Sequence, residues 1–268
     1  MTLRQVNGKM SVTPKPETEE YNVRNFVYVR RRPFHPRRLF DLIHDKFILQ
    51  QAEEEEDQEG GMEDVDGAED GVEMNDGEAP DEVDDADMED APELPDNATI
   101  IANKRAHPLF ARLFRSKGEI WLATRPNQAG EWSQAGAMLT ISGGRPWFAA
   151  IDKAEWESGN EEIDELVQYD MKAGGVYGDR RQELVFIGEK LDIKALEEVF
   201  DQCLLTDEEW ACWEGVMMAG QGPNTRDTAE MEKKVDELND MFEDGFFEWP
   251  SPDKAENEHD HAGHDHSH

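Results

Sequence analysis

The sequence has few cysteines and no long apolar run. Only Cys203 and Cys212 occur in 268 residues, which excludes a secreted scaffold held together by several disulfides. No apolar run approaches the roughly 20 residues that a membrane-spanning helix needs. Met1 to Thr18 is too polar for a signal peptide. We therefore expect an aqueous, reducing compartment, the cytoplasm or the nucleus.

Basic and large apolar residues are missing from one long block. The 44 residues from Glu53 to Asp96 contain 23 Asp or Glu, no Lys or Arg, and no Trp, Tyr, Phe or Ile. Such a segment cannot bury enough apolar surface to offset the entropy lost on ordering. We therefore predict a disordered insertion in a surface loop, which adds little closure entropy. The alternatives are a segment that binds basic proteins such as histones, and a weak cation buffer.

The remaining charge is moderate. The chain carries a net charge of −36, but outside the acidic block 40 acidic residues face 27 basic ones. This excess of negative charge would repel bare nucleic acid and anionic membranes. We therefore expect neither as a partner.

Catalytic motifs are also missing. Asn7-Gly8-Lys9-Met10 lacks the spacing and the hydroxyl group of a P-loop. The sequence shows no Ser/His/Asp set, no HExxH motif and no paired metal-binding cysteines. It therefore predicts no catalytic activity within these residues.

The stretch from Arg115 to Ile151 is rich in large apolar residues and holds three of the seven tryptophans. Its β-branched and aromatic runs, separated by Gly, Pro and Asn, indicate consecutive strands. The predicted strands are Glu119 to Thr124, Trp132 to Ile141 and Pro146 to Ile151. A central sheet is therefore expected here.

Further elements flank this sheet. Strands are predicted over Asn25 to Arg30 and Gln182 to Gly188. Apolar residues at helical spacing predict helices over Pro36 to Gln50, His107 to Phe114, Glu161 to Tyr169, Asp192 to Leu204, Thr206 to Met217 and Thr228 to Phe242. Asp192 suits an N-cap, and Thr206 with Glu209 forms a capping box. About five mostly antiparallel strands with one helical layer on one face make an α+β fold.

Four regions follow from this pattern. Residues 1–20 are a predicted disordered tail, and residues 21–217 are one domain interrupted by the acidic insertion 53–96. Residues 218–250 hold a linker, an amphipathic helix and a small apolar plug of Phe246, Phe247, Trp249 and Pro250. Residues 251–268 are a predicted disordered, His-rich tail.

The last ten residues, HDHAGHDHSH, suit metal capture. Imidazole is the commonest protein ligand for metals such as zinc, nickel and cobalt. Any three or four of these side chains in a flexible tail could close around one ion, although nothing preorganises them. The candidate ligands are His259, His261, His264, His266 and His268. An inert solvated terminus and an expression tag are the alternatives, although a tag is usually a pure His run.

Other reactive or charged residues have simpler interpretations. Cys203 lies on the apolar face of its predicted helix and is expected to be a buried, inert thiol. His35 precedes the first predicted helix and His44 lies on it, and a structural role is expected for both. The basic clusters near strand ends are either solvated or a docking surface for an acidic partner or a phosphate. They comprise Arg30 to Arg32, Arg37 with Arg38, Arg115 with Lys117, and Arg180 with Arg181.

Five blocks occur in the order known from one family. They are NFVYVRRRPFHPRRLFDLI, RSKGEIWLATRP, WSQAGAMLTISGGRPW, DRRQELVFIG and CLLTDEEW. Over about Asn25 to Gln50 and Leu113 to Trp210, the chain resembles the C-terminal domain of the CobW-like GTPases, a group of metal chaperones. His-rich segments recur in that family, and this supports metal binding by His259 to His268.

The sequence also departs from the family pattern, and this departure is as informative as the resemblance. Family members carry an N-terminal P-loop GTPase domain and a Cys-x-Cys-Cys metal motif, and neither occurs in these residues. The resemblance therefore implies a non-catalytic interaction and metal-handling module of a zinc or cobalt chaperone system. This module is either a stand-alone protein or the C-terminal part of a split or truncated GTPase. Its expected partners are a P-loop GTPase domain in trans or a metalloprotein client. The alternative is an acidic structural domain that binds basic proteins.

Overall fold

A computed structural model of the chain describes residues 2–6, 9–13, 23–50 and 95–249. The chain divides into two units, residues 1–52 with 95–268, and residues 53–94. The second unit, which is most of the acidic block, and the His-rich tail lie outside the described residues. The described residues all belong to the first unit.

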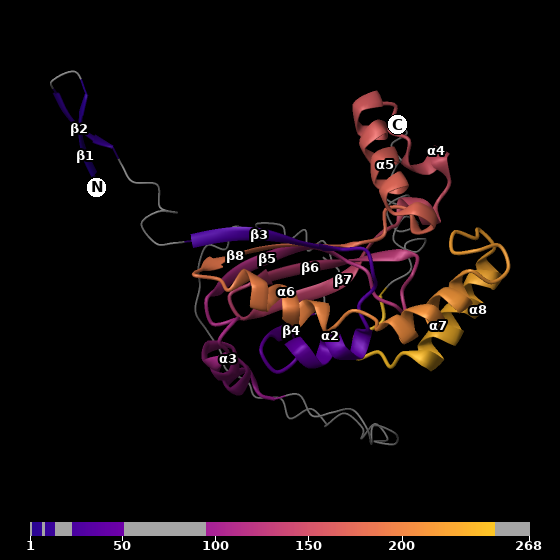
Figure 1. Ribbon diagram of the computed structural model, residues 1–268. Coiled ribbons are helices and arrows are strands. Elements are labelled where there is room, and N and C mark those ends of the chain that lie inside the picture. Colours follow the sequence, from indigo (N-terminus) through magenta and orange to yellow (C-terminus); the bar gives the residue numbers. More distant parts are fainter. Residues whose placement is uncertain (1, 7–8, 14–22, 51–94, 250–268) are drawn as a thin grey trace, which may run out of the picture. The chain divides into compact units, whose positions relative to one another are not determined.

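A six-stranded sheet organises this unit, in the order β3-β8-β5-β6-β7-β4. All neighbours run antiparallel except β4 and β7, which are parallel. The strands are β3 (Val23–Arg30), β4 (Ile48–Gln50), β5 (Leu113–Ile120), β6 (Gln128–Ala135), β7 (Met138–Pro146) and β8 (Gln182–Glu189). The predicted α+β class with a mostly antiparallel sheet is confirmed, with six strands in place of five (Figure 1).

The central hairpin turns earlier than predicted. The chain reverses at Gly136 and Ala137, so that Ala135 opposes Met138 and Gln134 opposes Leu139. The predicted strand from Trp132 to Ile141 therefore belongs to two strands. Gly136 has a φ of 59°, a left-handed conformation that glycine adopts without steric cost. Ser142 to Gly144, which lie between two of the predicted strands, belong instead to β7.

Four further boundaries differ from the sequence prediction. The predicted strand from Glu119 to Thr124 is β5, which begins at Leu113 and ends at Ile120. The first helix, α2 (Pro36–Ile43), ends early because Ile48 to Gln50 pair with β7 as strand β4. The segment 107–114 is not a helix but a turn that enters β5 at Leu113. Residues 148–150 form a 3-10 turn, η1 (Phe148–Ala150), in place of a strand. Strands β4 and β5 depend on pairing partners far along the chain.

One helical layer covers one face of the sheet, as predicted. Helices α2 and α6 (Ile193–Asp201) lie on the same side of the strands in Figure 1. Leu39, Ile43, Leu196 and Phe200 from these helices meet the inward side chains of the strands in one core. The strands contribute Tyr28, Ile120, Trp132, Leu139, Leu184 and Phe186.

A second apolar cluster lies beyond the sheet end. It is built by α7 (Asp207–Met217) and α8 (Thr228–Met241) around buried Trp121, Trp147 and Trp213. The capping box predicted at Thr206 and Glu209 is present, and Asp192 caps α6 as expected. From the predicted plug, Phe246 and Trp249 pack on the first core, whereas Phe247 is exposed.

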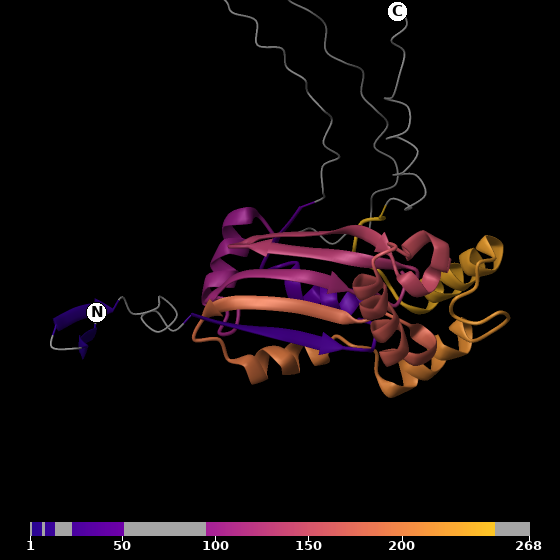
Figure 2. The same ribbon diagram turned by 90° about the horizontal axis from the view of Figure 1, so that it is seen from above.

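The remaining helices are α3 (Asn97–Ala106), α4 (Lys153–Trp156) and α5 (Glu161–Ala173), with a second 3-10 turn, η2 (Gly175–Tyr177). Asp96, the last residue of the acidic block, caps α3 by accepting a hydrogen bond from Thr99 N. Helix α5 rises on the side of the sheet opposite α2 and α6, and Figure 2 shows the uncovered face of the strands beside it.

The N-terminal segment departs from its prediction as an irregular tail. Strands β1 (Thr2–Val6) and β2 (Lys9–Thr13) form an antiparallel pair in which Thr2 opposes Thr13. The polar, proline-containing composition of residues 1–20 did not indicate this hairpin. Alternation of short β-forming residues over five positions is a weak signal against such a background.

Candidate functional site

The arginine-rich segment from β3 to α2 contains the first block of the family resemblance. Its centre is Phe34, which is fully buried and bridges two distant loops. Phe34 N donates to Trp121 O at 2.8 Å, and Phe34 O accepts from Ala123 N at 3.0 Å. The segment is therefore built into the sheet end, where it meets the loop after β5.

Arg38 on α2 is held by the start of α7. Its two terminal nitrogens bond Glu209 Oε1 at 2.7 Å and Oε2 at 2.6 Å, and Nη2 also donates to Leu204 O. Glu209 additionally accepts from Thr206 N at 2.8 Å. The hydrogen bonds from Arg38 lower the pKa of Glu209 to about 2. This group joins two helices rather than offering a free cation.

Arg30 is paired in a similar way at the end of β3. Arg30 Nε lies 2.7 Å from Asp201 Oδ1, which also accepts from the Tyr28 hydroxyl at 2.9 Å. Burial, together with the hydrogen bond to Asp201, raises the pKa of Tyr28 above its usual range. The side chains of Arg32 and Arg37 likewise reach Asp207, Asp41 and Glu243.

The hypothesis of an anion-docking surface is therefore not supported for most of the basic clusters. Their charges are balanced within the chain by carboxylates of α2, α6 and α7 and by Glu243 after α8. Arg181 pairs with Asp170 and Glu183. The side chains of Arg115 and Lys117 on β5 differ, since they have no hydrogen-bond or ion-pair partner among the described residues.

Arg180 has an unusual environment that the sequence did not predict. It is fully buried, and its guanidinium donates to three carbonyls and one amide oxygen rather than to a carboxylate. The acceptors are Pro126 O, Tyr177 O, Pro223 O and Asn224 Oδ1. Burial lowers its pKa to about 10. Arg180 therefore joins three loops, and no local pattern distinguishes it from Arg181.

Asp179, the residue before Arg180, is also buried. Its carboxylate accepts from Phe148 N at 3.1 Å and Ala149 N at 3.0 Å, and Arg145 Nη1 lies 3.3 Å away. It thereby satisfies the free backbone N–H groups at the start of η1. Its partners lie about thirty residues earlier in the chain, so sequence spacing gave no sign of this role.

Aromatic side chains cluster around Trp121. Trp210 and Trp213 stack with ring centroids 5.0 Å apart, and Tyr177 lies 5.2 Å from Trp210. The Tyr177 hydroxyl donates to Glu214 at 2.8 Å. Burial raises the pKa of Tyr177 above its usual range. These contacts make the family block ending in Trp210 a packing element.

Cys203 and His35 have the structural roles expected for them. Cys203 is buried, lies 3.6 Å from Arg38 O, and has a pKa raised by burial to about 12. His35 packs edge-on against Phe242 at 5.6 Å, and burial lowers its pKa. The His35 Nδ1 atom is buried and has no hydrogen-bond partner among the described residues. Within that part of the chain, neither side chain has the partner that a nucleophile or a general base needs.

Metal ligands do not converge in the part of the chain that the structure describes. No group of three or more His, Cys, Asp or Glu side chains is placed there to hold an ion. The five candidate ligands of the tail, His259 to His268, lie outside the described residues and stay a prediction. Within residues 2–6, 9–13, 23–50 and 95–249, no helix is long and apolar enough to cross a bilayer.

One protein family has a model that matches part of this sheet and its helices. Residues 97–204, from α3 through β8 to the loop after α6, match the "Cobalamin synthesis protein cobW C-terminal domain" family. The chain is therefore similar to the CobW C-terminal domain over these residues. The resemblance that the sequence blocks indicated is thereby confirmed over these residues. The matched region holds four of the six strands and none of the candidate metal ligands.

The chain is also similar to one further protein in sequence and, weakly, to two solved structures. Over 219 residues, the chain is 25% identical to "Zinc-regulated GTPase metalloprotein activator 1" of Dictyostelium discoideum, covering 79% of this chain and 32% of the relative. The chain thus spans about a third of the length of this relative. The crystal structure of Zn(II)-bound YjiA GTPase from E. coli is 11% identical, with a TM-score of 0.33, and the comparison covers 76% of this chain and 37% of that one. A triple mutant of the same GTPase gives the same identity and TM-score.

Proposed function

We propose that the chain is a non-catalytic interaction and metal-handling module of a CobW-like zinc chaperone system. The observation that carries the proposal is the match of residues 97–204 to the CobW C-terminal domain family, and it is supported by a relative named as a zinc-regulated GTPase metalloprotein activator. The matched region contains buried packing residues such as Trp121. Among its described side chains we find no set arranged for catalysis. GTP hydrolysis then requires a P-loop domain outside these 268 residues.

Metal capture in this proposal is assigned to the His-rich tail. Neutral imidazoles bind zinc well, and cobalt or nickel are the alternatives. The five histidines His259, His261, His264, His266 and His268 provide enough donors for one tetrahedral site. In the disordered tail that the composition predicts, conformational entropy is lost when the ligands close around an ion, and the weak binding that follows suits transfer to a metalloprotein client. The cytoplasm is the proposed compartment, with the nucleus as the alternative.

Calorimetric titration of the intact chain with zinc tests this assignment. Replacing the five tail histidines with Asn should reduce the zinc stoichiometry by about one ion per chain, while the circular dichroism spectrum stays unchanged. A matched control replaces His44 and His107, which lie in the folded part, and should keep the stoichiometry. Absence of zinc uptake by the unmodified chain would remove the basis for metal handling.

A GTPase partner is tested separately. The part of the Dictyostelium relative that lies outside its match to this chain can be assayed for zinc-dependent GTP hydrolysis with and without the chain added. An increase that is lost with the Arg38→Ala chain, in which the junction of α2 and α7 is broken, would support action in trans. An unchanged rate at saturating chain concentration would argue against it.

The second candidate function rests on the acidic block. Its 23 acidic residues without one base could bind basic proteins through charge. Binding of a histone mixture should then weaken steeply with salt and disappear when residues 53–94 are deleted. Binding that survives the deletion would eliminate this function for the block.

A further inference from the structure

The sheet face opposite α2 and α6 carries an apolar patch that no other helix or strand of the described residues covers. Val27 and Val29 on β3 are 51% and 44% exposed, and Val27 lies opposite Val185 on β8. Ile187 lies on the same face, two residues further along β8, and is also partly exposed. These four side chains form the patch. The residues that alternate with them along the strands, such as Tyr28 and Phe186, are fully buried and fill the core. The four outward side chains are therefore not needed for core packing.

Two unpaired cations border the apolar patch. Arg115 and Lys117 on β5 lie opposite Ile187 and Val185, and both are exposed. Their side chains have no hydrogen-bond or ion-pair partner among residues 23–50 and 95–249. Most other arginines of the folded part are held by carboxylates or carbonyls. This face therefore combines aliphatic side chains with available positive charge.

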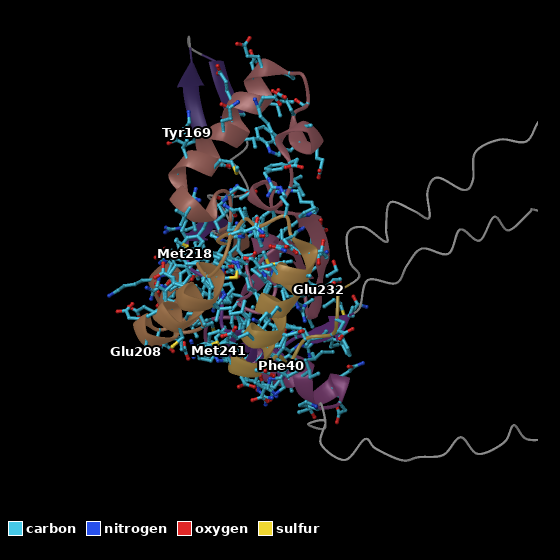
Figure 3. The ribbon with its side chains drawn as sticks, turned by 90° about the vertical axis from the view of Figure 1, so that its right-hand side faces the viewer. Phe40, Tyr169, Glu208, Met218, Glu232 and Met241 are labelled. Carbon is cyan, nitrogen blue, oxygen red and sulfur yellow. The ribbon has the colours of Figure 1, made fainter. Side chains whose placement is uncertain are left out.

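Helix α5 stands at the other end of the same face. Arg181, just before β8, pairs with Asp170 of α5 at 3.2 Å and with Glu183 on the open face. Leu166 lies one helical turn from Asp170 and therefore on the same stripe. Leu166 and Tyr169 are 68% and 71% exposed. Figure 3 shows Tyr169 and Phe40 toward opposite sides of the sheet, as expected for helices on opposite faces.

The outward side of α5 is acidic as well as apolar. Glu162 and Glu165 are exposed next to Ile163, Leu166 and Tyr169, and neither carboxylate has an ion-pair partner among the described residues. An exposed apolar stripe with acidic neighbours is suited to a partner surface that is apolar with basic neighbours. The patch around Val27 and Val185, with Arg115 and Lys117, has this composition.

The register places these two surfaces at opposite ends of the strands. Glu119 opposes Glu183 near α5, whereas Arg115 opposes Ile187 four residues away. A two-fold rotation that reverses the strand direction therefore lays the acidic end of one copy over the basic end of another. Val27 and Val185 lie near the middle of the two strands and would meet their own equivalents. This is the self-complementarity that a two-fold interface requires.

We propose that the open sheet face and the outward stripe of α5 form a homodimer interface, in which α5 of each copy packs beside Arg115 and Lys117 of the other. Charge complementarity within one chain is what selects a second copy over a different partner. The proposal is independent of metal handling, because none of these residues is a candidate metal ligand. The high net negative charge opposes association at low salt, so moderate salt should favour the dimer.

Sedimentation velocity of the full chain with a chelator present tests the proposal. The chelator, and a parallel run of the chain with its five tail histidines replaced, exclude dimers bridged by metal. We expect a concentration-dependent dimer whose dissociation constant rises at least about tenfold in Val27→Glu. Met218→Glu is the matched control, since Met218 is 49% exposed and lies at the C-terminal end of α7, outside the strands and α5. A chain that stays monomeric throughout, or a dimer unaffected by Val27→Glu, overturns the proposal.

Charge reversal tests the arrangement within the dimer. Arg115→Glu and Glu162→Arg should each weaken the dimer, and an equimolar mixture of the two variants should associate more tightly than either alone. Both side chains are exposed, so unchanged thermal unfolding would exclude misfolding as the cause. A mixture no tighter than the separate variants contradicts the packing of α5 beside Arg115. Association restored by another protein but not by a second copy would identify a different occupant and contradict the homodimer.

Discussion

Arg38 and Glu209 form a bidentate ion pair, with nitrogen–oxygen distances of 2.7 and 2.6 Å. The pair joins α2, which follows the first strand of the sheet, to α7, which follows the last one. Glu209 also completes the capping box of α7. The Glu209 carboxylate thereby stabilises the first turn of α7 and also holds α7 against α2.

Glu209→Gln should lower the free energy of unfolding by about 1–2 kcal/mol near neutral pH, because charged hydrogen bonds to Arg38 become neutral ones. The folded-state pKa of Glu209 is about 2, below its ordinary value of 4.5. Its contribution is therefore present above pH 4.5 and is lost as the pH falls toward 2. Urea unfolding across this range should show a smaller pH dependence in the variant.

Glu208→Gln is the control for this measurement. Glu208 is exposed beside Glu209 and has no ion-pair partner among the described residues. Its substitution should leave the pH dependence unchanged. An equal effect of both substitutions would show that the Arg38 pair is not its source.

Arg180→Met should destabilise the fold by about 3 kcal/mol or more. The variant leaves the buried carbonyls of Pro126, Tyr177 and Pro223 without their donor, and such losses are costly in a buried site. Arg105→Met, at an exposed position of α3, should change the unfolding free energy by less than about 0.5 kcal/mol. Comparable urea midpoints for the two variants would refute the role assigned to Arg180.

Gly118→Ala should also be strongly destabilising, by more than about 2 kcal/mol. Gly118 has a φ of 155°, and a Cβ atom there would lie against Glu183 O on the neighbouring strand, at 1.9 Å. Gly215→Ala is the matched comparison, because Gly215 lies within α7 and a Cβ atom added to it would have nothing within 4 Å. That change should stabilise the chain by about 0.5–1 kcal/mol. Thermal unfolding of both variants gives the comparison directly.

The two cysteines should differ sharply in reactivity. Cys203 is buried with a pKa of about 12, whereas Cys212 is exposed. Because the thiolate is the reacting form, a thiol reagent should modify one cysteine quickly in the native chain and both in urea. Cys212→Ser should abolish the fast phase, and Cys203→Ala should leave it intact. Fast labelling of Cys212→Ser would show that Cys203 is accessible.

Local patterns predicted the elements whose residues act on their own neighbours. The capping box at Thr206 requires only Glu209, three residues later, and the cap at Asp192 requires only the backbone of Ala195. The apolar spacing of Leu196 and Phe200 identified the buried face of α6 for the same reason. Such features form wherever the local sequence allows them.

Predictions failed where a distant partner decided the outcome. Ile48 to Gln50 continue an apolar helical pattern, yet they pair with Met138 to Thr140 as strand β4. Arg180 and Arg181 are adjacent and identical in type, yet one is buried among carbonyls and the other pairs with carboxylates. Their difference depends on strand alternation and on loops more than forty residues away.

By itself, the sequence determined the fold class, the CobW-like blocks, the helix caps and the composition of the acidic block and His-rich tail. These depend on residue type and short spacing, which the chain carries in any conformation. Only the tertiary structure decided which cations are neutralised, because ion pairs such as Arg38 with Glu209 join residues 171 positions apart. It also left Arg115 and Lys117 exposed beside Val27 and Val185, since only strand register brings these side chains to one face.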